Sequence, residues 1–394
     1  MVRSVRKRIL FLTGTRADYG KLRPLIERVD EAHEFECRIF ATGMHTLSRY
    51  GATYEEIQKR GAGDLYLYIN QTADSSAATD MVLAHTVQGL GHYLREFPPD
   101  LIVVHGDRIE TLAGAIVGAL NDILVAHMEG GELSGTIDEL IRHAVTKLSH
   151  LHFVANEEAR TRVVQMGETE DSVFVTGSAD IDVMLSGDLP SLEEARRRYD
   201  IDFADYSIFI YHPVSSELDH LDRHIKAVVA AVCECGRNFI LIYPNNDPGA
   251  DRILDAIHPL STRPCFRLFP SLRFEYFLTL LRHADAIVGN SSAGVREAPV
   301  YGVPTVNIGS RQHNRFFHAS IVNVPEDRET ILWSLQDLPR RVAPSLHFGR
   351  GGCADAFMKI LRAPGFWRRP RQKQFRDLQA SALTQPLAAA GVGG

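Results

Sequence analysis

The sequence predicts an α/β protein with two doubly wound, Rossmann-like domains whose strand ends face a shared cleft. Three observations support this prediction. Short runs that are apolar at every position alternate with longer amphipathic segments, which is typical of parallel strands covered by helices on both faces. A charged, turn-rich stretch at residues 186–206 interrupts the alternation once, and the pattern then resumes. The chain has 394 residues, 45% of them hydrophobic, which is enough for two cores.

In the first half of the chain, short apolar runs are the predicted strands and amphipathic segments between them are the predicted helices. The strands are expected at residues 8–12, 37–41, 65–69, 101–105, 123–127, 151–155 and 172–176. The helices are expected at residues 74–96, 109–120, 137–149 and 157–166. Strands that alternate with helices in this way indicate a parallel sheet.

The second half repeats the alternation after the charged stretch, which we interpret as the interdomain linker. Its strands are expected at residues 206–212, 238–243, 265–269, 284–289 and 304–308. In the linker, Ser191 and Glu194 have the spacing of a capping box and predict the start of a helix. We therefore expect a first domain at 1–185, a second domain at 186–365, and a C-terminal helix with a frayed tail at 366–394.

Composition argues against several classes of function. The formal net charge is −6 and the isoelectric point is about 6.3, so we expect no nucleic-acid partner and no membrane partner. The chain starts with basic residues, but the apolar run at 9–12 is too short for a signal peptide, and we expect a cytoplasmic protein. The five cysteines lack zinc-site spacing, and His150 and His152 have no evident third ligand, so we expect no metal.

Carboxylates gather where two neighbouring predicted strands end. Asp107 follows the strand at 101–105, and Glu129, Glu132, Asp138 and Glu139 follow the strand at 123–127. Carboxyl ends of parallel strands are where α/β sheets bind ligands, so these acids indicate proton chemistry on a bound substrate. For Asp138 a structural interpretation is also open, because Thr136 and Glu139 have capping-box spacing and Arg142, one turn away, can pair with Asp138.

The first strand leads into a glycine-rich turn that predicts an anion site. Gly14 and Gly20 flank the turn, and a helix is expected to begin near residues 17–19. The free N–H groups of a helix start attract phosphate, Arg16 can grip it in a bidentate way, and Lys21 is placed to approach the cleft. The turn matches neither GxGxxG nor a Walker A loop, which argues against a nicotinamide cofactor; a plain tight turn with a solvated arginine stays open.

A second anion site is predicted in the other half of the chain. After the strand at 284–289 come Asn290, Ser291 and Ser292, small residues that we expect to begin a helix and to bind phosphate. Glu297, one turn later, can accept hydrogen bonds from ribose, although it can also simply complement the helix dipole. His212 ends the strand at 206–212, so we expect it to face the same cleft from the opposite wall.

Five ordered motifs carry a resemblance to a known family. They are TGTRADYGKL, VHGDRIETLA, AHMEGGELSGTIDELIRHAVTKLSHLHF, YHPVS and NSSAGVREAPVYGVPTVNIGSRQ, and they span roughly residues 8–315. Together they resemble the sugar-nucleotide 2-epimerases, which implies a two-domain GT-B-type fold. The match is to the hydrolysing branch, because this chain has GTRADYG and EGGELSGTIDE where non-hydrolysing relatives show GTRPE and EAGLRT.

The resemblance implies an activity, a substrate and an assembly. Similar proteins convert UDP-N-acetylglucosamine to N-acetylmannosamine and UDP for sialic-acid-type synthesis. Close relatives act on UDP-2,4-diacetamido-2,4,6-trideoxyglucose for legionaminic-type acids. The resemblance also implies a UDP-sugar as the bound partner, no cofactor, and a homodimer or homotetramer.

The same resemblance implies roles for individual residues. The catalytic acids fall on Asp107, Glu129 and Asp138. The substrate contacts fall on Arg16, Lys21, His45, His212, Asn290, Ser291, Ser292 and Glu297, with His45 expected near the sugar.

Chemistry favours elimination as the route to inversion at C2. The C2 proton does not lie next to a carbonyl carbon, so a base alone cannot remove it. If UDP leaves first, C1 becomes cationic and C2–H acidifies, which gives a 2-acetamidoglucal that water then converts to the free epimer. Two rivals remain open: a GT-B glycosyltransferase, which needs an acceptor, and a non-catalytic sugar-nucleotide sensor, which needs no acids around the sugar.

Overall fold

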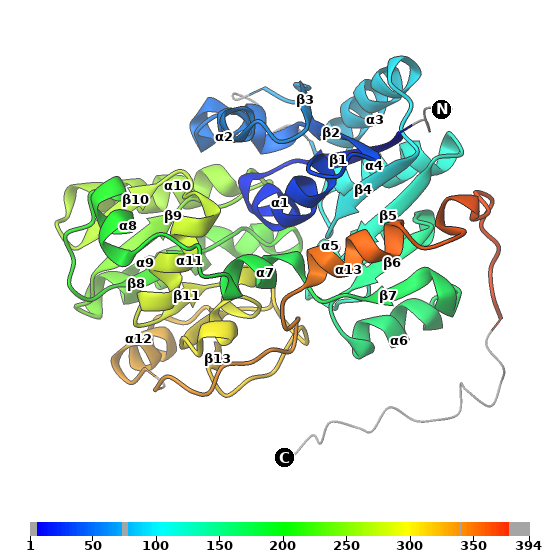
Figure 1. Cartoon of the computed structure of the whole chain (residues 1–394). Helices are drawn as coiled ribbons and strands as arrows, with labels where there is room; N and C mark the ends of the chain where they lie inside the picture. The colour runs from blue at the N-terminus through cyan, green and yellow to red at the C-terminus, as the bar shows by residue number, and fades with distance from the viewer. Residues whose placement is uncertain (1–5, 73–77, 339, 378–394) are drawn as a thin grey trace.

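The computed structural model describes residues 6–72, 78–338 and 340–377, and in it the chain forms two α/β domains (Figure 1). Each domain is built on one parallel sheet, of seven strands in the first domain and six in the second. The prediction of two doubly wound domains is confirmed.

The first sheet has the strand order β3-β2-β1-β4-β5-β6-β7. Its strands are β1 (Lys7–Thr13), β2 (Phe35–Ala41), β3 (Asp64–Leu67), β4 (Leu101–His105), β5 (Leu124–Met128), β6 (Leu151–Val154) and β7 (Val173–Val175). The helices of this part are α1 (Arg16–Asp30), α2 (Tyr54–Arg60), α3 (Thr79–Glu96), α4 (Ile109–Leu120), α5 (Ile137–Leu148), α6 (Glu157–Gln165) and α7 (Ala179–Leu185).

The second sheet has the order β10-β9-β8-β11-β12-β13. Its strands are β8 (Ser207–Ile210), β9 (Phe239–Ile242), β10 (Phe266–Phe269), β11 (Ile287–Gly289), β12 (Thr305–Ile308) and β13 (Ile321–Val324). The later helices are α8 (Leu192–Tyr199), α9 (Leu221–Glu234), α10 (Ala250–Ile257), α11 (Phe274–His283), α12 (Arg328–Gln336) and α13 (Cys353–Leu361). The capping box that was expected to start a helix in the linker is present at Ser191 and Glu194.

Side-chain alternation in β1 explains why strands of this protein read as continuous apolar runs. Ile9 and Phe11 pack in the core on one face of the first sheet, and Leu10 and Leu12 pack in the core on the other face. A parallel strand covered by helices on both sides buries every residue, so its sequence loses the polar alternation of a half-exposed strand. All of the predicted strands are found, although the edge strands β3 and β7 are not buried on both faces.

The edge strand β13 is the strand that the sequence analysis missed. In Ile321–Val324, Asn323 is exposed and Ile321 and Val322 are only partly buried. An edge strand with solvent on one side has neither a continuous apolar run nor enough length to stand out from a loop.

The strand order fixes where a ligand can bind. In the first sheet, β2 and β3 lie on one side of β1, and β4 and the later strands lie on the other side. In the second sheet, β9 and β10 lie on one side of β8, and β11 and the later strands lie on the other. The topological switch points are therefore between β1 and β4 and between β8 and β11. Crevices outside the carboxyl ends of strands at such switch points are the usual binding places of doubly wound sheets. The segments that follow β1, β4, β5, β8 and β11 therefore have the best position for a site.

The C-terminal segment returns to the first domain. Cys353, Phe357 and Leu361 of α13 belong to the core that contains Ile9 and Phe11 of β1, whereas the sequence analysis assigned residues up to 365 to the second domain (Figure 1). An amphipathic helix can cover either sheet, and its sequence does not say which sheet has an uncovered apolar face.

The helix expected after residue 366 is absent from the described part of that segment. Residues 366–368 form one short 3-10 turn, and residues 369–377 are irregular. Their backbone instead follows the first domain, where Lys373 Nζ donates to the main-chain oxygen of Lys147 at 2.8 Å, near the end of α5. The rest of the expected tail, residues 378–394, lies outside the described residues.

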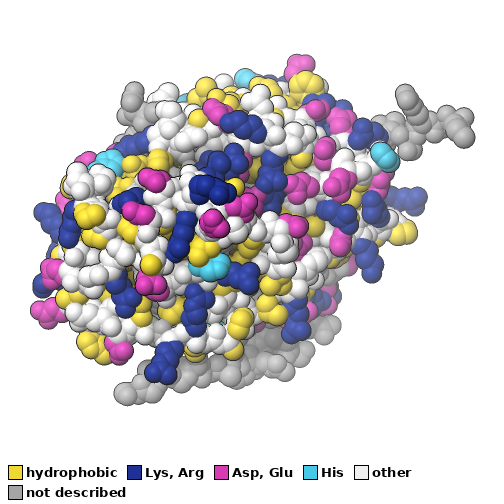
Figure 2. Space-filling view, turned by 60° about the vertical axis from the view of Figure 1, so that its left-hand side comes forward, with side chains coloured by type: hydrophobic (Ala, Val, Ile, Leu, Met, Phe, Trp, Pro, Cys, Tyr) yellow, Lys and Arg dark blue, Asp and Glu magenta, His cyan; other side chains and the backbone are white. Residues whose placement is uncertain are grey.

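Charges of both signs cover the surface in view. On the face shown in Figure 2, Lys and Arg side chains are interspersed with Asp and Glu side chains. Within the described residues, none of the helices has the length and apolar character that a bilayer crossing requires.

Candidate active site

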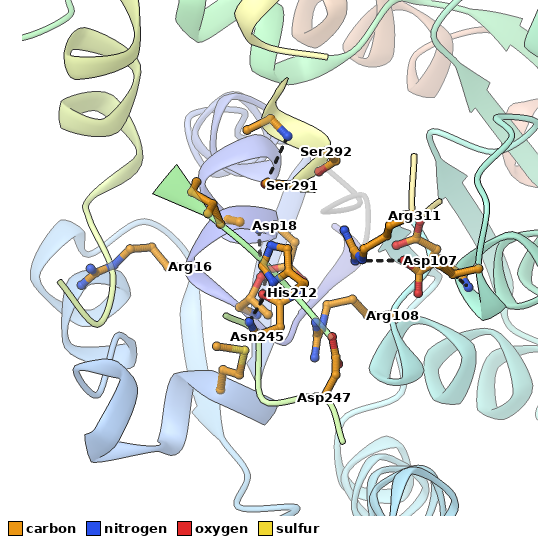
Figure 3. A pocket seen from close by; sticks show the side chains of 18 of the residues that line it. Arg16, Asp18, Asp107, Arg108, His212, Asn245, Asp247, Ser291, Ser292 and Arg311 are labelled. Carbon is orange, nitrogen blue, oxygen red and sulfur yellow. Dashed lines mark hydrogen bonds and ion pairs between the residues drawn. The ribbon is translucent and has the colours of Figure 1, made fainter. Parts of the chain in front are cut away.

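A cavity of about 320 Å³ lies between the two domains and is lined by both of them. The first domain contributes Arg16, Lys21, Asp107, Glu129 and Asp138; the second contributes His212, Ser291, Ser292, Glu297 and Arg311. Arg16 lies at one end, Asp107 and Arg311 lie at the other, and His212 lies between them (Figure 3). The volume falls in the range of sites for small organic ligands, which are about 300–1,000 Å³.

The turn after β1 is stabilised by its own side chains. Helix α1 begins at Arg16, slightly earlier than predicted, because Thr15 and Asp18 form a capping box. Arg16 is not a solvated surface arginine: its Nη1 donates to Ser271 Oγ at 2.7 Å, and its Nε lies 3.0 Å from Glu56 Oε2. Since Ser271 belongs to the second domain, Arg16 links the two walls of the cavity.

Lys21 lies at the back of the cavity between two carboxylates. Its Nζ lies 2.9 Å from Glu297 Oε1 and 3.2 Å from Asp180 Oδ2, and all three side chains are buried. Burial by itself disfavours the charged amine, but Asp180, Glu129 and Glu297 outweigh it and raise the pKa of Lys21. Burial raises the pKa of Asp180, while Lys21 and Arg296 overcome burial at Glu297 and lower its pKa.

Glu129 follows β5 directly and is held in an unusual backbone conformation. Its φ is +64°, in the left-handed region that a glutamate rarely adopts. Its carboxylate accepts from Ser178 Oγ at 2.7 Å and lies 2.8 Å from Arg296 Nη2 and 3.2 Å from His105 Nε2. Burial opposes ionisation here, yet Arg296, Lys21 and His105 lower the pKa of Glu129, so it is a carboxylate at neutral pH.

Asp107 and Asp138 stand on the same side of the cavity but have different partners. Asp107 forms an ion pair with Arg142 of α5, and its side chain is 23% exposed. Asp138 Oδ2 lies 3.1 Å from Arg311 Nη2. The pairing of Arg142 with Asp138 that the sequence suggested is therefore wrong, because α5 turns Arg142 towards the strand-end loop of β4.

The expected capping box at the start of α5 forms only in part. Thr136 Oγ1 accepts from the N–H of Asp138 at 3.3 Å, as an N-cap residue does. Glu139 does not return to the N–H of Thr136; its carboxylate accepts from the N–H of Ser134 at 2.7 Å. The side chain of Asp138 is thus left to face the cavity.

The loop after β11 differs from the α-helix that the sequence predicted. Residues 292–294 and 298–301 form two 3-10 turns, with Pro299 inside the second and Gly302 ending it at a φ of +66°. Proline and a left-handed glycine this close together leave no room for a regular helix. Ser291 and Ser292 still line the cavity.

His212 is a neutral imidazole at the cavity wall. Its Nδ1 accepts from the N–H of Asn245 at 3.0 Å, and burial lowers its pKa well below the usual value. A neutral ring whose Nδ1 accepts a hydrogen bond carries its proton on Nε2. Asn290 does not line the cavity; its side chain accepts from the N–H of His212 at 2.6 Å and donates to the carbonyl of His212 at 2.9 Å. It therefore positions His212.

His45 lies behind the cavity and does not line it. It is fully buried, with Nδ1 2.7 Å from Thr53 Oγ1 and Nε2 3.0 Å from Thr13 Oγ1. Burial lowers the pKa of His45 to about 4. Both ring nitrogens are engaged with protein groups, and the expected position of His45 near the sugar stays a prediction.

Sequence reasoning missed several charged residues of the site. Glu132 was noticed, but not that Arg296 and Arg315 both pair with it, Arg315 at 3.1 Å. Asp107 was identified because it follows the carboxyl end of a predicted strand. The same rule, applied after the predicted strand at residues 304–308, would have found Arg311 and Arg315. Charged or titratable residues that received no role include His105, Arg108, Asp180, Arg296, Arg311 and Arg315.

Potential metal ligands come together at one place among the described residues. Glu217, His224 and Glu326 each place a ligand atom within 4.8 Å of the other two. None of these three residues lines the cavity.

Comparison with known proteins identifies close relatives. The family described as UDP-N-acetylglucosamine 2-epimerase matches residues 27–362. A UDP-N-acetylglucosamine 2-epimerase of Neisseria meningitidis serogroup B is 43% identical over 94% of this chain and 99% of its own length. A UDP-N,N'-diacetylbacillosamine 2-epimerase (hydrolyzing) of Legionella pneumophila is 33% identical over 90% of this chain and 96% of its own length.

Solved structures share the fold. A UDP-GlcNAc 2-epimerase from Methanocaldococcus jannaschii, in complex with UDP-GlcNAc and UDP, superposes with a TM-score of 0.75 at 21% identity, over 90% of this chain and 99% of that one. A UDP-GlcNAc 2-epimerase from Neisseria meningitidis bound to UDP-GlcNAc superposes with a TM-score of 0.70 at 16% identity, with the same coverage. The two-domain architecture is thus that of known GT-B-like proteins.

Proposed function

This chain belongs to the UDP-N-acetylglucosamine 2-epimerase family, and on that premise we propose that it is a hydrolysing member that converts UDP-N-acetylglucosamine to N-acetylmannosamine and UDP. The observation that carries the proposal is the composition of one cavity. Three carboxylates, Asp107, Glu129 and Asp138, share it with cationic and hydroxyl groups contributed by both domains.

Binding would divide the substrate between the two ends of the cavity. Arg16, His212, Ser291 and Ser292 offer a guanidinium, an imidazole N–H and two hydroxyls, which suit a diphosphate. Glu297 then accepts hydrogen bonds from the ribose. The sugar lies towards Asp107 and Asp138, away from Arg16.

The reaction proceeds by elimination and rehydration. The bond between C1 and the diphosphate oxygen breaks, and its electrons leave with UDP, whose developing charge Arg16 and His212 stabilise. A carboxylate takes the C2 proton, which gives the 2-acetamidoglucal. Water then adds its oxygen to C1, and C2 receives a proton on the opposite face. The sum is one water consumed per sugar nucleotide, with no electron transfer to a cofactor. Proton delivery of this kind contributes typically about 10²–10⁴-fold to the rate.

One incubation tests the proposal. The protein is given UDP-N-acetylglucosamine in D₂O, and the products are followed by NMR and mass spectrometry. We expect UDP, free N-acetylmannosamine and one deuterium at C2. Release of UDP together with a free 2-epimerised sugar, with no acceptor present, excludes a glycosyltransferase, and binding without turnover indicates a sensor. Product without deuterium at C2 contradicts the elimination route.

Variants of the three acids separate their roles in the same assay. The base that removes the C2 proton is proposed to be Asp107 or Glu129. In the variant that lacks it, Asp107→Asn or Glu129→Gln, C2 keeps its proton and glucal formation stops. If Asp138→Asn removes the group that assists rehydration, free 2-acetamidoglucal accumulates in the medium. Asp188→Asn is a suitable control, since this exposed acid of the linker does not line the cavity.

A second substrate is supported by one of the relatives. The Legionella protein acts, by its name, on UDP-N,N'-diacetylbacillosamine, which carries a 4-acetamido group. The higher identity to the Neisseria protein, 43% against 33%, favours UDP-N-acetylglucosamine. Parallel incubations with both substrates decide between them through kcat/KM.

We further propose that the protein assembles as a homodimer or homotetramer. Light scattering of the purified protein at several concentrations tests this. A mass equal to that of one chain at all concentrations contradicts it.

A further inference from the structure

The two oxygens of the Glu129 carboxylate have different surroundings. Oε1 accepts a hydrogen bond from Ser178 Oγ at 2.7 Å and lies 2.8 Å from Arg296 Nη2. Oε2 lies 3.2 Å from His105 Nε2, a group that is charged only when the ring is protonated. Oε1 is therefore held by a neutral donor and a permanent cation, and Oε2 is the more weakly held oxygen.

The hydroxyl of Ser178 can direct its proton to one partner only. Ser178 Oγ accepts a hydrogen bond from Arg296, whose guanidinium nitrogens donate and do not accept. The single proton of the hydroxyl is therefore left for Glu129 Oε1. While Ser178 makes these two contacts, Oε1 acts as an acceptor, and a proton that Glu129 takes up has to bind to Oε2.

The place of Ser178 in the chain would usually give its hydroxyl another partner. Ser178 is the N-cap residue of α7, and an N-cap serine normally accepts from a free N–H group of the first helical turn. The side chain of Ser178 makes no such capping hydrogen bond. Its hydroxyl is turned towards Glu129, so this serine contributes to the site and not to the start of the helix.

A crossing of two distant backbone segments fixes Ser178 behind Glu129. The N–H of Ser178 donates to the main-chain oxygen of Phe348 at 2.8 Å. A Cβ added at Gly177, the preceding residue, would lie 3.1 Å from Gly349 Cα, so the two backbones are in direct contact. Ser178 is 1% exposed and does not line the cavity, so it reaches a bound substrate only through its partners.

Charged or titratable groups from several elements face the same carboxylate. Arg296, Lys21 and His105 favour the ionised form of Glu129 and lower its pKa, whereas the buried carboxyl of Asp180 opposes ionisation. Replacing Ser178 by alanine leaves all of these charges in place. The substitution therefore changes the hydrogen bonding of one oxygen without changing the net charge of the site.

We propose that Ser178 is a positioning residue that holds Oε1 of Glu129, so that Oε2 is the oxygen that takes the C2 proton of the sugar. In this step the C2–H bond breaks and the proton bonds to Oε2. The electron pair of the C2–H bond forms the C1–C2 double bond of the glucal after UDP has left. The inference rests on the proposed function, with Glu129 as the base, and adds the proton-accepting atom and the residue that orients it.

The kinetics of Ser178→Ala test the proposal. We expect kcat to fall roughly 10- to 100-fold, the usual effect of losing one hydrogen bond to a charged group. KM and UDP affinity should stay within about threefold of the wild type, because Ser178 does not line the cavity. The acidic limb of the kcat profile should move to higher pH, since the ionised carboxylate loses a donor.

Two further variants serve as controls. Ser178→Thr keeps the hydroxyl and should recover part of kcat. Ser186→Ala is matched to Ser178→Ala, because Ser186 lies at the other end of α7, outside the cavity, and donates to the main-chain oxygen of Val183 at 2.9 Å. Its kcat, KM and pH profile should equal those of the wild type.

A second readout does not depend on turnover. In protein labelled with ¹³C at the side-chain carboxyl of glutamate, the signal of Glu129 is identified by its absence from Glu129→Gln. We expect this signal to titrate at a higher pH in Ser178→Ala than in the wild type, and to be unchanged in Ser186→Ala. Calorimetric binding of UDP shows that each variant keeps a folded site.

Three results would overturn the proposal. An unchanged kcat in Ser178→Ala would mean that the hydroxyl is not needed. A lower kcat with an unmoved acidic limb and an unmoved Glu129 signal would mean that Ser178 is structural. Glucal formation that continues in Glu129→Gln would mean that another group is the base. A wild type that hydrolyses no UDP-sugar contradicts the proposed function, and the titration then still decides whether Ser178 stabilises the Glu129 carboxylate.

Discussion

Replacing Lys21 by methionine removes the cation from a buried charge cluster at the back of the cavity. Lys21 Nζ lies 2.9 Å from Glu297 and 3.2 Å from Asp180. At an effective dielectric constant of about 20, each of these pairs carries roughly 5 kcal/mol of Coulomb attraction, most of it offset by desolvation of the ions. Methionine fits the space of the lysine stem but leaves two buried carboxylates without their ion-pair partner. We expect the free energy of unfolding to fall by about 3–5 kcal/mol at pH 8.

The pH dependence of this loss distinguishes charge from packing. In the variant the folded-state pKa values of Asp180 and Glu297 should lie above their unfolded values of about 4, so the folded state takes up protons. The destabilisation is therefore small near pH 4 and grows as the pH rises through the raised folded pKa values. A packing defect would give the same loss at both pH values.

The assay needs a reporter for the first domain. Trp367 packs against the core of the first domain, whereas Trp333 lies on α12 of the second, so a Trp333→Phe background isolates the first signal. Urea unfolding is then followed by Trp367 fluorescence at pH 8 and near pH 4. Lys59→Met is the matched control, because Lys59 is an exposed lysine paired with Glu55, and it should change stability by under about 0.5 kcal/mol.

The reasoning is refuted if Lys21→Met costs under about 1 kcal/mol at pH 8, well below the usual cost of breaking a buried pair. It is also refuted if the cost is the same near pH 4. A double variant, Lys21→Met with Glu297→Gln, should regain part of the loss, because one of the uncompensated charges is gone.

Three further predictions concern other parts of the molecule. Gly135→Ala should lower kcat by at least about 10-fold, because the added methyl group would clash with the main-chain oxygen of Ser310 and displace the loop after β12. Gly187→Ala, where nothing lies within 4 Å of the added atom, should leave steady-state kinetics unchanged. His45, whose pKa is lowered to about 4, should stay neutral in ¹⁵N NMR spectra from pH 8 to 5. Its contribution to stability should be lost as the pH falls below the unfolded pKa of about 6.5. A ring that titrates near 6.5 refutes the burial of His45. Lys373→Met should lower the unfolding free energy of the first domain by about 1–3 kcal/mol, because Glu168 and the last carbonyls of α5 lose a hydrogen-bond donor. An unchanged urea midpoint would show that this contact of the C-terminal segment adds no stability.

Local pattern was enough to predict the fold and the place of the cavity between the domains. Burial on both faces of a parallel sheet makes each strand an unbroken apolar run, and the carboxyl ends of such strands share one edge. Asp107, after β4, and Glu129, after β5, could therefore be placed together from the sequence, since the two strands are neighbours. Where local rules failed, they failed for local reasons: β13 is a half-exposed edge strand, and Pro299 and Gly302 prevent the expected helix after β11.

Only the tertiary structure decided which partner each charged group has. The sequence placed Arg142 beside Asp138, one turn apart, but the structure pairs Arg142 with Asp107 and Asp138 with Arg311, which is 173 residues distant in the chain. It also gave both ring nitrogens of His45 threonine partners. The backbone hydrogen bonds of a helix, and the burial of one face of a helix or strand, repeat every few residues. They therefore leave a periodic pattern in the sequence. The contact of two separate domains is set by their relative placement, for which the sequence carries no such period.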